Sequence, residues 1–174
     1  TMATDIAGNT ETPGAGNIFK YDTTRPISRV TYPVDNGYYR SLAILSGTVA
    51  DPDTGPGTTG IDSVKVLIRR SDGNYYQGSN IWLPVATELD TTLFDMGPGN
   101  KTARWRRDWD LPDWVDNEQY QIQSKAYDRA GNSELEPIHP GSTWRCDKTA
   151  PTVGITLPVT PERSYRWIPT ISGT

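Results

Sequence analysis

The feature that most constrains this chain is a block of sequence that occurs twice. Residues 1–9 read TMATDIAGN and residues 124–132 read SKAYDRAGN, with an Asp at the fifth position and Ala-Gly-Asn at the end of both blocks. Two further motifs recur in the same order and at nearly the same separation: Asp-x-Thr-x-Pro at 22–26 and 147–151, and Ser-Gly-Thr at 46–48 and 172–174. Because both order and spacing are preserved, the sequence predicts tandem repeats of one structural unit.

These anchors divide the chain into one complete unit and two partial ones. We expect a complete repeat over 22–146, the last strands of a preceding repeat over 1–21, and the first strands of a following repeat over 147–174. Both ends of the sequence then fall inside copies of strands, and a bisected strand leaves backbone hydrogen bonds unmade. Two arrangements would satisfy those bonds: further repeats in a longer chain, or strands donated between identical chains in a head-to-tail filament.

Alternation of apolar and polar residues predicts strands within the complete unit. In the segment 118–126, Tyr120, Ile122 and Ala126 fall on one face and a series of glutamines falls on the other. Further strands are expected over 27–32, 42–49, 61–70, 102–111 and 142–147, with a long connection of short strands over 75–100. A bulge is expected at Gly47. About seven short strands separated by Gly, Pro, Asn and Asp indicate an all-β antiparallel sandwich.

Composition limits the classes of function. The 174 residues are 34% hydrophobic and 10% aromatic, which is sufficient to build a core. The formal charge of −4 argues against a nucleic-acid partner, because phosphate contacts require clustered Lys and Arg. The apolar runs are too short for membrane insertion. Cys146 is the only cysteine, so no disulfide forms within the chain.

The motifs together resemble the immunoglobulin-like repeats that occur in tandem in large secreted, surface and adhesin proteins of bacteria. Tyr120, at the start of its strand, resembles the tyrosine corner of such sandwiches, in which the hydroxyl bonds nearby backbone. The residues that carry the resemblance are Asp22, Thr24 and Pro26; Ser46, Gly47 and Thr48; Gly60, Ile61, Val64 and Val66; Gly73, Asn74, Tyr75, Tyr76, Gly78 and Trp82; Trp105; and Tyr120, Ala126, Asp128, Gly131 and Asn132.

The resemblance implies an immunoglobulin-like fold and an extracellular or cell-surface location. It also implies a non-catalytic role as a stalk, spacer or filament module, with adhesion as a further role. Its partners would be neighbouring repeats of the same or an identical chain. The loops at 51–60 and 87–101 are longer than a minimal repeat needs, and long loops on a rigid sandwich often carry binding sites.

Calcium is the cofactor that the sequence favours. In an immunoglobulin-like sandwich, the start of the first strand and two of the loops lie at one end of the domain. That end would gather five oxygen-bearing side chains: Asp22, Asp51, Asp53, Asp128 and Asn132. Ca²⁺ takes about six to eight oxygen ligands, and carboxylates and amides supply them. The competing interpretation is structural, because Asp and Asn also begin turns by bonding their own backbone.

Aromatic residues give an alternative function, a carbohydrate- or protein-binding module whose partner is a surface glycan or protein. Flat rings stack on sugar faces, and Tyr and Trp add a polar group to the ring. The candidate ligand-binding residues are Tyr38, Tyr39, Tyr75, Tyr76 and Trp82. Burial is the competing interpretation for any large ring, and for Trp105 and Trp109 we favour a place in the core.

A catalytic role is not expected. His139 is the only histidine and Cys146 the only cysteine, so zinc chemistry and a Ser-His-Asp triad have little to build on. Asp108 and Asp110 would share one strand face by alternation, but Asp in such segments more often caps a turn. Asn100-Lys101-Thr102 matches the acceptor triplet for N-glycosylation.

Overall fold

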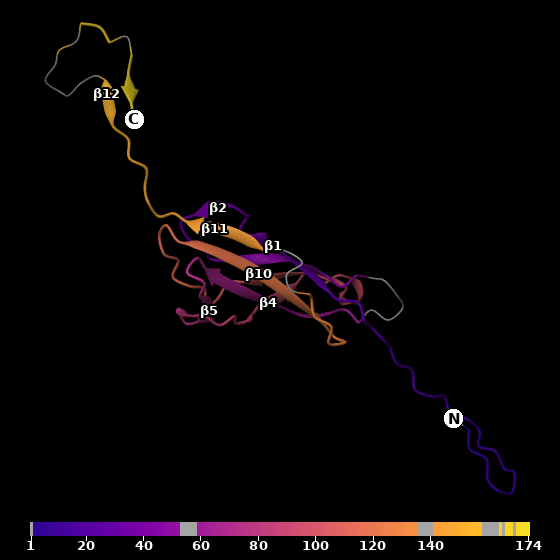
Figure 1. Ribbon diagram of the computed structural model, residues 1–174. Coiled ribbons are helices and arrows are strands. Elements are labelled where there is room, and N and C mark those ends of the chain that lie inside the picture. Colours follow the sequence, from indigo (N-terminus) through magenta and orange to yellow (C-terminus); the bar gives the residue numbers. More distant parts are fainter. Residues whose placement is uncertain (1, 53–58, 136–140, 158–163, 165, 169) are drawn as a thin grey trace.

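The computed structural model contains a sandwich of two β-sheets, from which the terminal segments extend at opposite ends (Figure 1). The structure describes residues 2–52, 59–135, 141–157, 164, 166–168 and 170–174. Within these ranges the helical content is a single 3-10 turn, η1 (Pro98–Asn100), so none of the described residues belongs to a helix that could cross a membrane. The expected all-β fold class is confirmed.

The two sheets have the strand order of an immunoglobulin-like sandwich, with A-B-E-D in one sheet and G-F-C in the other. The smaller sheet contains, in spatial order, β1 (Ile27–Tyr32), β3 (Leu45–Ala50), β9 (Thr102–Arg107) and β8 (Thr92–Phe94). The larger contains β2 (Gly37–Tyr39), β11 (Ser142–Cys146), β10 (Gln119–Asp128), β4 (Ile61–Arg70), β5 (Tyr75–Gly78) and β6 (Ile81–Leu83), and β7 (Leu89–Asp90) also pairs with β4. Neighbouring strands are antiparallel except β2 and β11, which are parallel.

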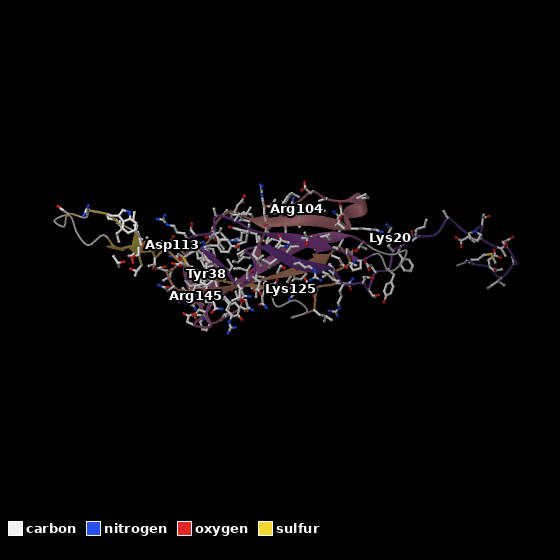
Figure 2. All side chains as sticks on the ribbon, turned by 90° about the horizontal axis from the view of Figure 1, so that it is seen from above. Lys20, Tyr38, Arg104, Asp113, Lys125 and Arg145 are labelled. Carbon is white, nitrogen blue, oxygen red and sulfur yellow. The ribbon has the colours of Figure 1, made fainter. Side chains whose placement is uncertain are left out.

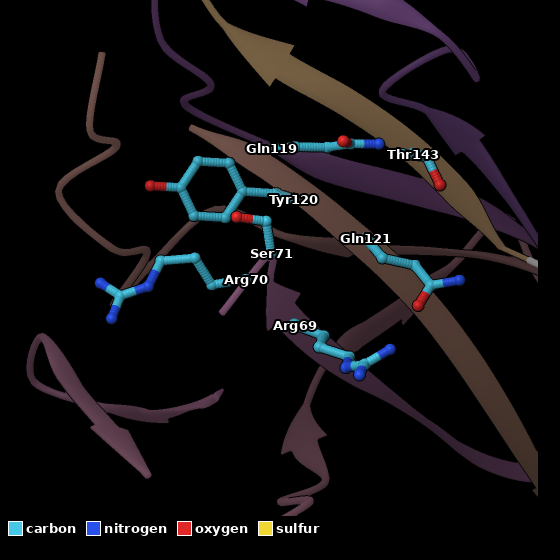
Figure 3. Close-up of a pocket in the computed structure, with 7 residues that line it drawn as sticks. All are labelled: Arg69, Arg70, Ser71, Gln119, Tyr120, Gln121 and Thr143. Carbon is cyan, nitrogen blue, oxygen red and sulfur yellow. The ribbon is translucent and has the colours of Figure 1, made fainter. Parts of the chain in front are cut away.

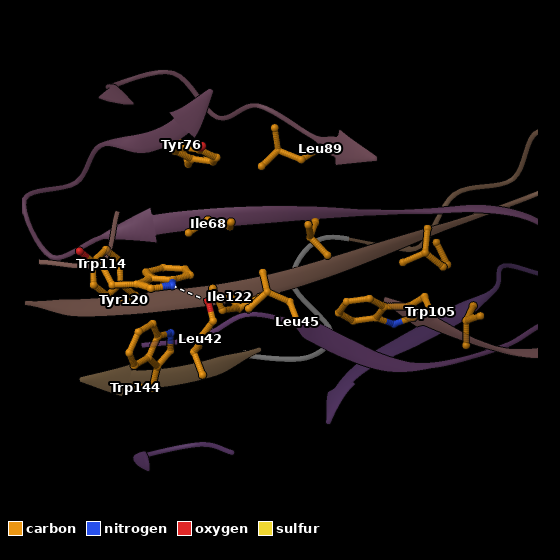
Figure 4. Close-up of a cluster of buried hydrophobic side chains, with 14 of the residues drawn as sticks. Leu42, Leu45, Ile68, Tyr76, Leu89, Trp105, Trp114, Tyr120, Ile122 and Trp144 are labelled. Atoms are coloured by element: carbon orange, nitrogen blue, oxygen red, sulfur yellow. Dashed lines mark hydrogen bonds between the residues drawn. The ribbon is translucent and has the colours of Figure 1, made fainter. Parts of the chain in front are cut away.

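One half of the core lies at the start of β10, where aromatic rings pack edge to face or stacked (Figure 4). The Tyr120 ring lies 4.9 Å from that of Trp114 and 5.2 Å from that of Trp144. Its hydroxyl accepts a hydrogen bond of 2.9 Å from the backbone N–H of Val115, which confirms the expected tyrosine corner. Trp114 Nε1 in turn donates to the carbonyl of Leu42 at 2.8 Å. These contacts join the start of β10 and strand β11 to the β9–β10 connection, which holds Trp114, and to the β2–β3 connection, which holds Leu42.

Trp105 fills the other half of the core and explains one glycine. It is fully buried and stands opposite Gly47 in the β3–β9 register. A Cβ atom added to Gly47 would lie 2.5 Å from the Trp105 ring and 1.9 Å from the carbonyl oxygen of Arg29. The expected bulge is present at Gly47, but the extra residue lies in the partner strand: the register shifts between Val30 and Tyr32 of β1, opposite Gly47 and Ser46. Gly47 itself is needed for close packing.

A buried carboxylate connects the two sheets. Glu134 is 5% exposed and follows the turn at the end of β10. It accepts hydrogen bonds from the backbone N–H and hydroxyl of Ser28 at 3.0 and 2.6 Å, and from the N–H of Ala126 at 3.1 Å. Since Ser28 belongs to β1 and Ala126 to β10, this side chain joins the outer strand of one sheet to the central strand of the other.

The expected strand over 102–111 is too long. Alternation continues to Trp109, but β9 ends at Arg107, and Trp109 is 40% exposed instead of buried. Arg107 is buried, and its guanidinium donates to the carbonyls of Asp90 and Asp110. Asp110 has a positive φ of 45°. These contacts turn the chain away from the sheet, so Asp108 and Asp110 do not share a strand face.

The segment 3–11 reproduces the hydrogen bonds of the turn after β10. The carboxylate of Asp5 accepts from the backbone and amide nitrogens of Asn9 at 2.8 and 2.7 Å. The carboxylate of Asp128 accepts from the same two atoms of Asn132 at 2.7 and 2.7 Å. Glu11 N–H bonds the carbonyl of Ala3, just as Glu134 N–H bonds that of Ala126.

The C-terminal segment reproduces the pairing of the first two long strands of the smaller sheet. β12 (Ile155–Leu157) pairs with β13 (Ser172–Gly173), and a register irregularity separates the two residue pairs, as it does in β1 and β3. The matching pairs are Ile155–Gly173 with Val30–Gly47, and Leu157–Ser172 with Tyr32–Ser46. β12 and β13 form a separate sheet of two strands.

The packing at Gly47 predicts a specific cost for a single methyl group. Replacing Gly47 with Ala should lower the free energy of unfolding by about 1–3 kcal/mol, because Trp105 and β1 must both move. Gly14→Ala is the matched control, since no heavy atom lies within 4 Å of its added Cβ. Urea unfolding followed by tryptophan fluorescence measures both variants, and equal stabilities would contradict this account.

Candidate metal centre where the first linker enters the sandwich

Three carboxylates meet at the end of the sandwich where the chain enters β1 through residues 22–26, which we call the first linker. Asp22 lies in that linker, Asp51 directly follows β3, and Asp128 is the last residue of β10. The antiparallel pairing of β1 with β3, and of β4 with β10, brings these three chain positions to one end. One carboxylate oxygen from each residue lies within 4.8 Å of the other two.

Hydrogen bonds fix the orientation of Asp22. One of its oxygens accepts from the backbone N–H of Thr24 at 2.9 Å, which closes an Asx turn within the linker. The other accepts from the N–H and hydroxyl of Thr59 at 2.7 and 2.9 Å. Although partial burial raises the pKa of Asp22, the bonds from Thr59 and Thr24 outweigh it and leave the pKa below its usual value.

Asp128 is held by the turn that it begins, and the same turn holds the linker. It accepts from the N–H of Ala130 at 2.9 Å and from the backbone and amide nitrogens of Asn132. The Asn132 amide also donates to the carbonyl of Asp22 at 3.1 Å. Asn132, an expected ligand, therefore lies beside the carboxylates and joins this turn to the linker through its nitrogen.

Asp51 differs from its two neighbours because one of its oxygens lacks a donor. The residue is 2% exposed, and its Oδ2 accepts from the N–H of Gly60 at 2.9 Å. For Oδ1, which is fully buried, the described part of the chain provides no hydrogen-bond partner. Burial raises the pKa of Asp51, and the charges of Asp22 and Asp128 raise it further. An orphaned carboxylate oxygen beside two other carboxylates is unfavourable unless a cation approaches it.

The donor set suits a hard divalent cation. All the groups are oxygens, which calcium and magnesium prefer to nitrogen or sulfur. A carboxylate offers about four acceptor positions, so Asp22 and Asp128 retain capacity for a metal after accepting their hydrogen bonds. The three carboxylates provide fewer oxygens than calcium takes, and water or backbone carbonyls would supply the rest. Asp53, the fifth expected ligand, lies outside the described residues.

The structure separates the five aromatic candidates. Tyr38 is 69% exposed on β2, and Tyr75 is half-buried on the outer face of β5. Tyr76 is buried in the core, where its ring lies 5.3 Å from that of Trp82. Tyr39 packs edge to face on Trp144 and bonds the N–H of Val34 through its hydroxyl. Of the five candidates, only Tyr38 and Tyr75 thus face outward from the larger sheet.

The remaining candidate residues that the structure describes are buried or hydrogen-bonded to neighbouring protein groups. Asn100 is half-buried with a φ of 57°, and with its amide oxygen toward Arg129 it accepts two hydrogen bonds from the guanidinium. Cys146 is buried, which raises the pKa of its thiol. Asp110 accepts from the hydroxyl of Tyr76 and the N–H of Ser79. His139 lies outside the described residues.

Sequence reasoning missed the residues that position the carboxylates. Thr59 and Gly60 end the long loop that begins with the expected ligands Asp51 and Asp53, and each donates a backbone N–H to a different member of the cluster. Gly60 has a φ of 85°, and a Cβ there would lie 2.6 Å from the carbonyl oxygen of Gly99. The available signal in the sequence was a glycine directly before a predicted strand, a position where positive φ often requires glycine.

Comparisons with protein-family models and with curated proteins found no match to this chain.

The raised pKa of Asp51 predicts how the metal-free protein responds to pH. The folded state holds the Asp51 proton more tightly than the unfolded state, so stability is lost as pH rises from 3.8 through the raised pKa. Asp51→Asn removes this loss, and in a chelator at pH 7 it should stabilise the protein by about 1–2 kcal/mol. Below pH 3.8 the gain should shrink, because Asp51 is then protonated. Urea unfolding at both pH values measures it.

Asp72→Asn is the control with the opposite sign. A hydrogen bond from Arg70 lowers the pKa of Asp72 to about 2, so its carboxylate contributes stability above the unfolded pKa. Replacement should therefore destabilise the protein at pH 7. If Asp51→Asn were destabilising as well, the carboxylate cluster would not be strained in the metal-free protein.

Proposed function

We propose that this chain is a non-catalytic structural module from an extended extracellular or cell-surface protein built of tandem immunoglobulin-like repeats. The observation that carries the proposal is the duplication of local geometry. The segment 3–11 repeats the bonds of 126–134, and the β12–β13 pair repeats the register of β1 and β3. Two different fragments of one fold, placed on either side of a complete copy, are expected of a window on a repeat array.

Exposed apolar side chains in the terminal segments support the same proposal. Phe19 is 84% exposed, whereas its counterpart Trp144 is buried in the core. Ile171 is likewise exposed, and its counterpart Leu45 is fully buried. Monomeric soluble proteins rarely expose such groups in clusters, so each terminal segment needs the remaining strands of its own repeat to cover it.

Strand donation between identical chains would cover these groups less well. The N-terminal segment supplies counterparts of the end of β10 and of β11, and the C-terminal segment supplies counterparts of β1 and β3. Joined together, they would still lack a counterpart of β4, the strand that pairs along the whole of β10. A sandwich without its central strand exposes its core, which favours a covalent array over a strand-donating filament.

The segment 147–151, which follows β11 and which we call the second linker, is held to the sandwich, as a stiff junction requires. The N–H of Asp147 bonds the carbonyl of Tyr39 at 3.0 Å. Asp116 then accepts from the N–H of Lys148 at 2.6 Å and from the hydroxyl of Thr149 at 3.1 Å. The bond from Lys148 is the main reason that the pKa of Asp116 lies below its usual value. These contacts leave little freedom in the first residues of the linker.

A calcium ion between Asp22, Asp51 and Asp128 would stiffen the first linker in the same way. The cation would offset the repulsion among three carboxylates, two of which are buried. Because Asp22 belongs to the linker and the other two residues to the sandwich, binding would join the two parts. The orphaned oxygen of Asp51 is the observation that supports this site over a purely structural role for the carboxylates.

The mass of the native protein tests the array. We expect the fully denatured native chain to be several times heavier than the 19.3 kDa of this sequence, because each terminal segment needs the rest of its repeat. Denaturation separates a covalent array from a strand-donating filament, which would fall apart into short chains. A native chain of about 19.3 kDa that assembles head to tail would overturn the proposal.

Thermal melting tests the cation. Saturating calcium should stabilise the protein, by about 2.7 kcal/mol when its concentration is a hundred times the dissociation constant. Asp51→Asn should abolish this response. Asp116→Asn, at the opposite end of the sandwich, should retain it. A melting midpoint that is the same in calcium and in chelator would exclude the metal.

A further inference from the structure

A shallow groove crosses the outer face of the larger sheet. One part, of about 300 Å³, lies over β4 and β10 and is lined by Arg69, Gln119 and Gln121 (Figure 3). An adjoining part, of about 160 Å³, lies over β11 and β2 and is lined by Tyr38 and Arg145. Gln119 and Thr143 line both parts, so the two form one continuous surface.

The groove is positively charged in a chain whose net charge is −4. Arg69 and Arg145 are exposed, and among the described residues neither forms an ion pair. The described residues that line the groove include no carboxylate. By contrast, Arg104 and Arg106 on the opposite sheet pair with Asp95 and Asp108. Figure 2 shows Arg104 on one side of the sandwich, with Tyr38 and Arg145 on the other.

Strand register places each arginine between an amide and a ring. Arg145 on β11 stands next to Gln119 on β10 and Tyr38 on β2. Arg69 on β4 stands next to Gln121 and Tyr75, and its guanidinium carbon lies 5.9 Å from the centre of the Tyr75 ring. Neighbouring strands are about 4.8 Å apart, so these residues form two cross-strand rows. Figure 3 shows the Arg69 and Gln121 side chains pointing the same way.

This combination of groups matches a sugar that carries carboxylates. An arginine fork binds a carboxylate with two parallel hydrogen bonds. The amides of Gln119 and Gln121 and the hydroxyl of Thr143 both donate and accept, as sugar hydroxyls do. The exposed ring of Tyr38 offers a flat face for a sugar ring. An acidic peptide would use the charges and the amides, but an acidic side chain offers no flat face to stack on the ring.

We propose that the outer face of the larger sheet binds an acidic oligosaccharide, a chain of uronic acid residues laid across β2, β11, β10 and β4. Arg69 and Arg145 bind carboxylates, Gln119 and Gln121 bind hydroxyls, and Tyr38 stacks on a sugar ring. The surface lies at the end of the sandwich away from the carboxylate cluster, so it leaves the first linker free.

Calorimetry on the whole 174-residue chain tests the proposal, with hexasaccharides of galacturonic, glucuronic and mannuronic acid as probes. The neutral galactose hexasaccharide and hexaglutamate are the comparison ligands. We expect at least one uronate to bind, and the two comparison ligands to bind at least tenfold more weakly. The double variant Arg69→Gln, Arg145→Gln should weaken uronate binding at least tenfold, and Tyr38→Ala several-fold.

The control variant is Arg104→Gln with Arg106→Gln, which removes the same charge from the opposite sheet. It should leave uronate affinity unchanged within a factor of two, and thermal melts establish that every variant is folded. Three outcomes would overturn the proposal: no binding of any of the three uronates, equal loss of affinity in the control variant, or equally tight binding of hexaglutamate. The last result would mean that the surface recognises charge alone.

Discussion

The packing of Tyr120 between Trp114 and Trp144 is the contact on which the rest of the sandwich depends. Tyr120 fixes the start of β10, and the register of β10 against β4 then determines the position of every later residue on that strand. The same strand delivers Asp128 to the carboxylate cluster at its far end and presents its glutamines on the outer face. A shift of one residue would exchange the two faces and remove both candidate sites at once.

At the first linker, the groups that would hold the proposed calcium ion lower the stability of the metal-free protein. Asp51 is buried beside two other carboxylates, and nothing in the described chain satisfies its second oxygen. A sequence selected for stability alone would place an amide there, because an amide has no charge to desolvate. The cost is local, whereas the core of Trp105, Trp144 and Tyr120 supplies stability elsewhere. Functional sites commonly retain such unfavourable groups.

The sequence predicted those strands whose bounds are set by nearby residues, and it failed where contacts distant in sequence set them. The strands over 27–32 and 61–70 have their expected bounds, since both are rich in β-branched residues and are followed directly by turn residues. Strand β2 was not expected. It has three residues, one of them a glycine, which is too short to show periodicity, and its partner β11 is distant in sequence. Strand β9 is shorter than expected because buried Arg107 ends it through contacts with Asp90 and Asp110. The grouping of Asp22, Asp51 and Asp128 followed from topology. The orientation of Asp22 and Asp51 depends on bonds from Thr59 and Gly60, which alternation does not place.

The parallel pairing of β2 with β11 determines how the sandwich carries tension. The chain enters before β1 at one end and leaves after β11 at the other (Figure 1). Pulling on both linkers loads the β1–β3 pair first, because the first linker joins β1, and then drags β2 and β11 in opposite directions along their own axes. The hydrogen bonds between them are loaded together in shear, whereas a hairpin pulled from one end opens one bond at a time. With Asp147 bonded to Tyr39 at the end of β2, the exit linker transmits its load directly to that pair.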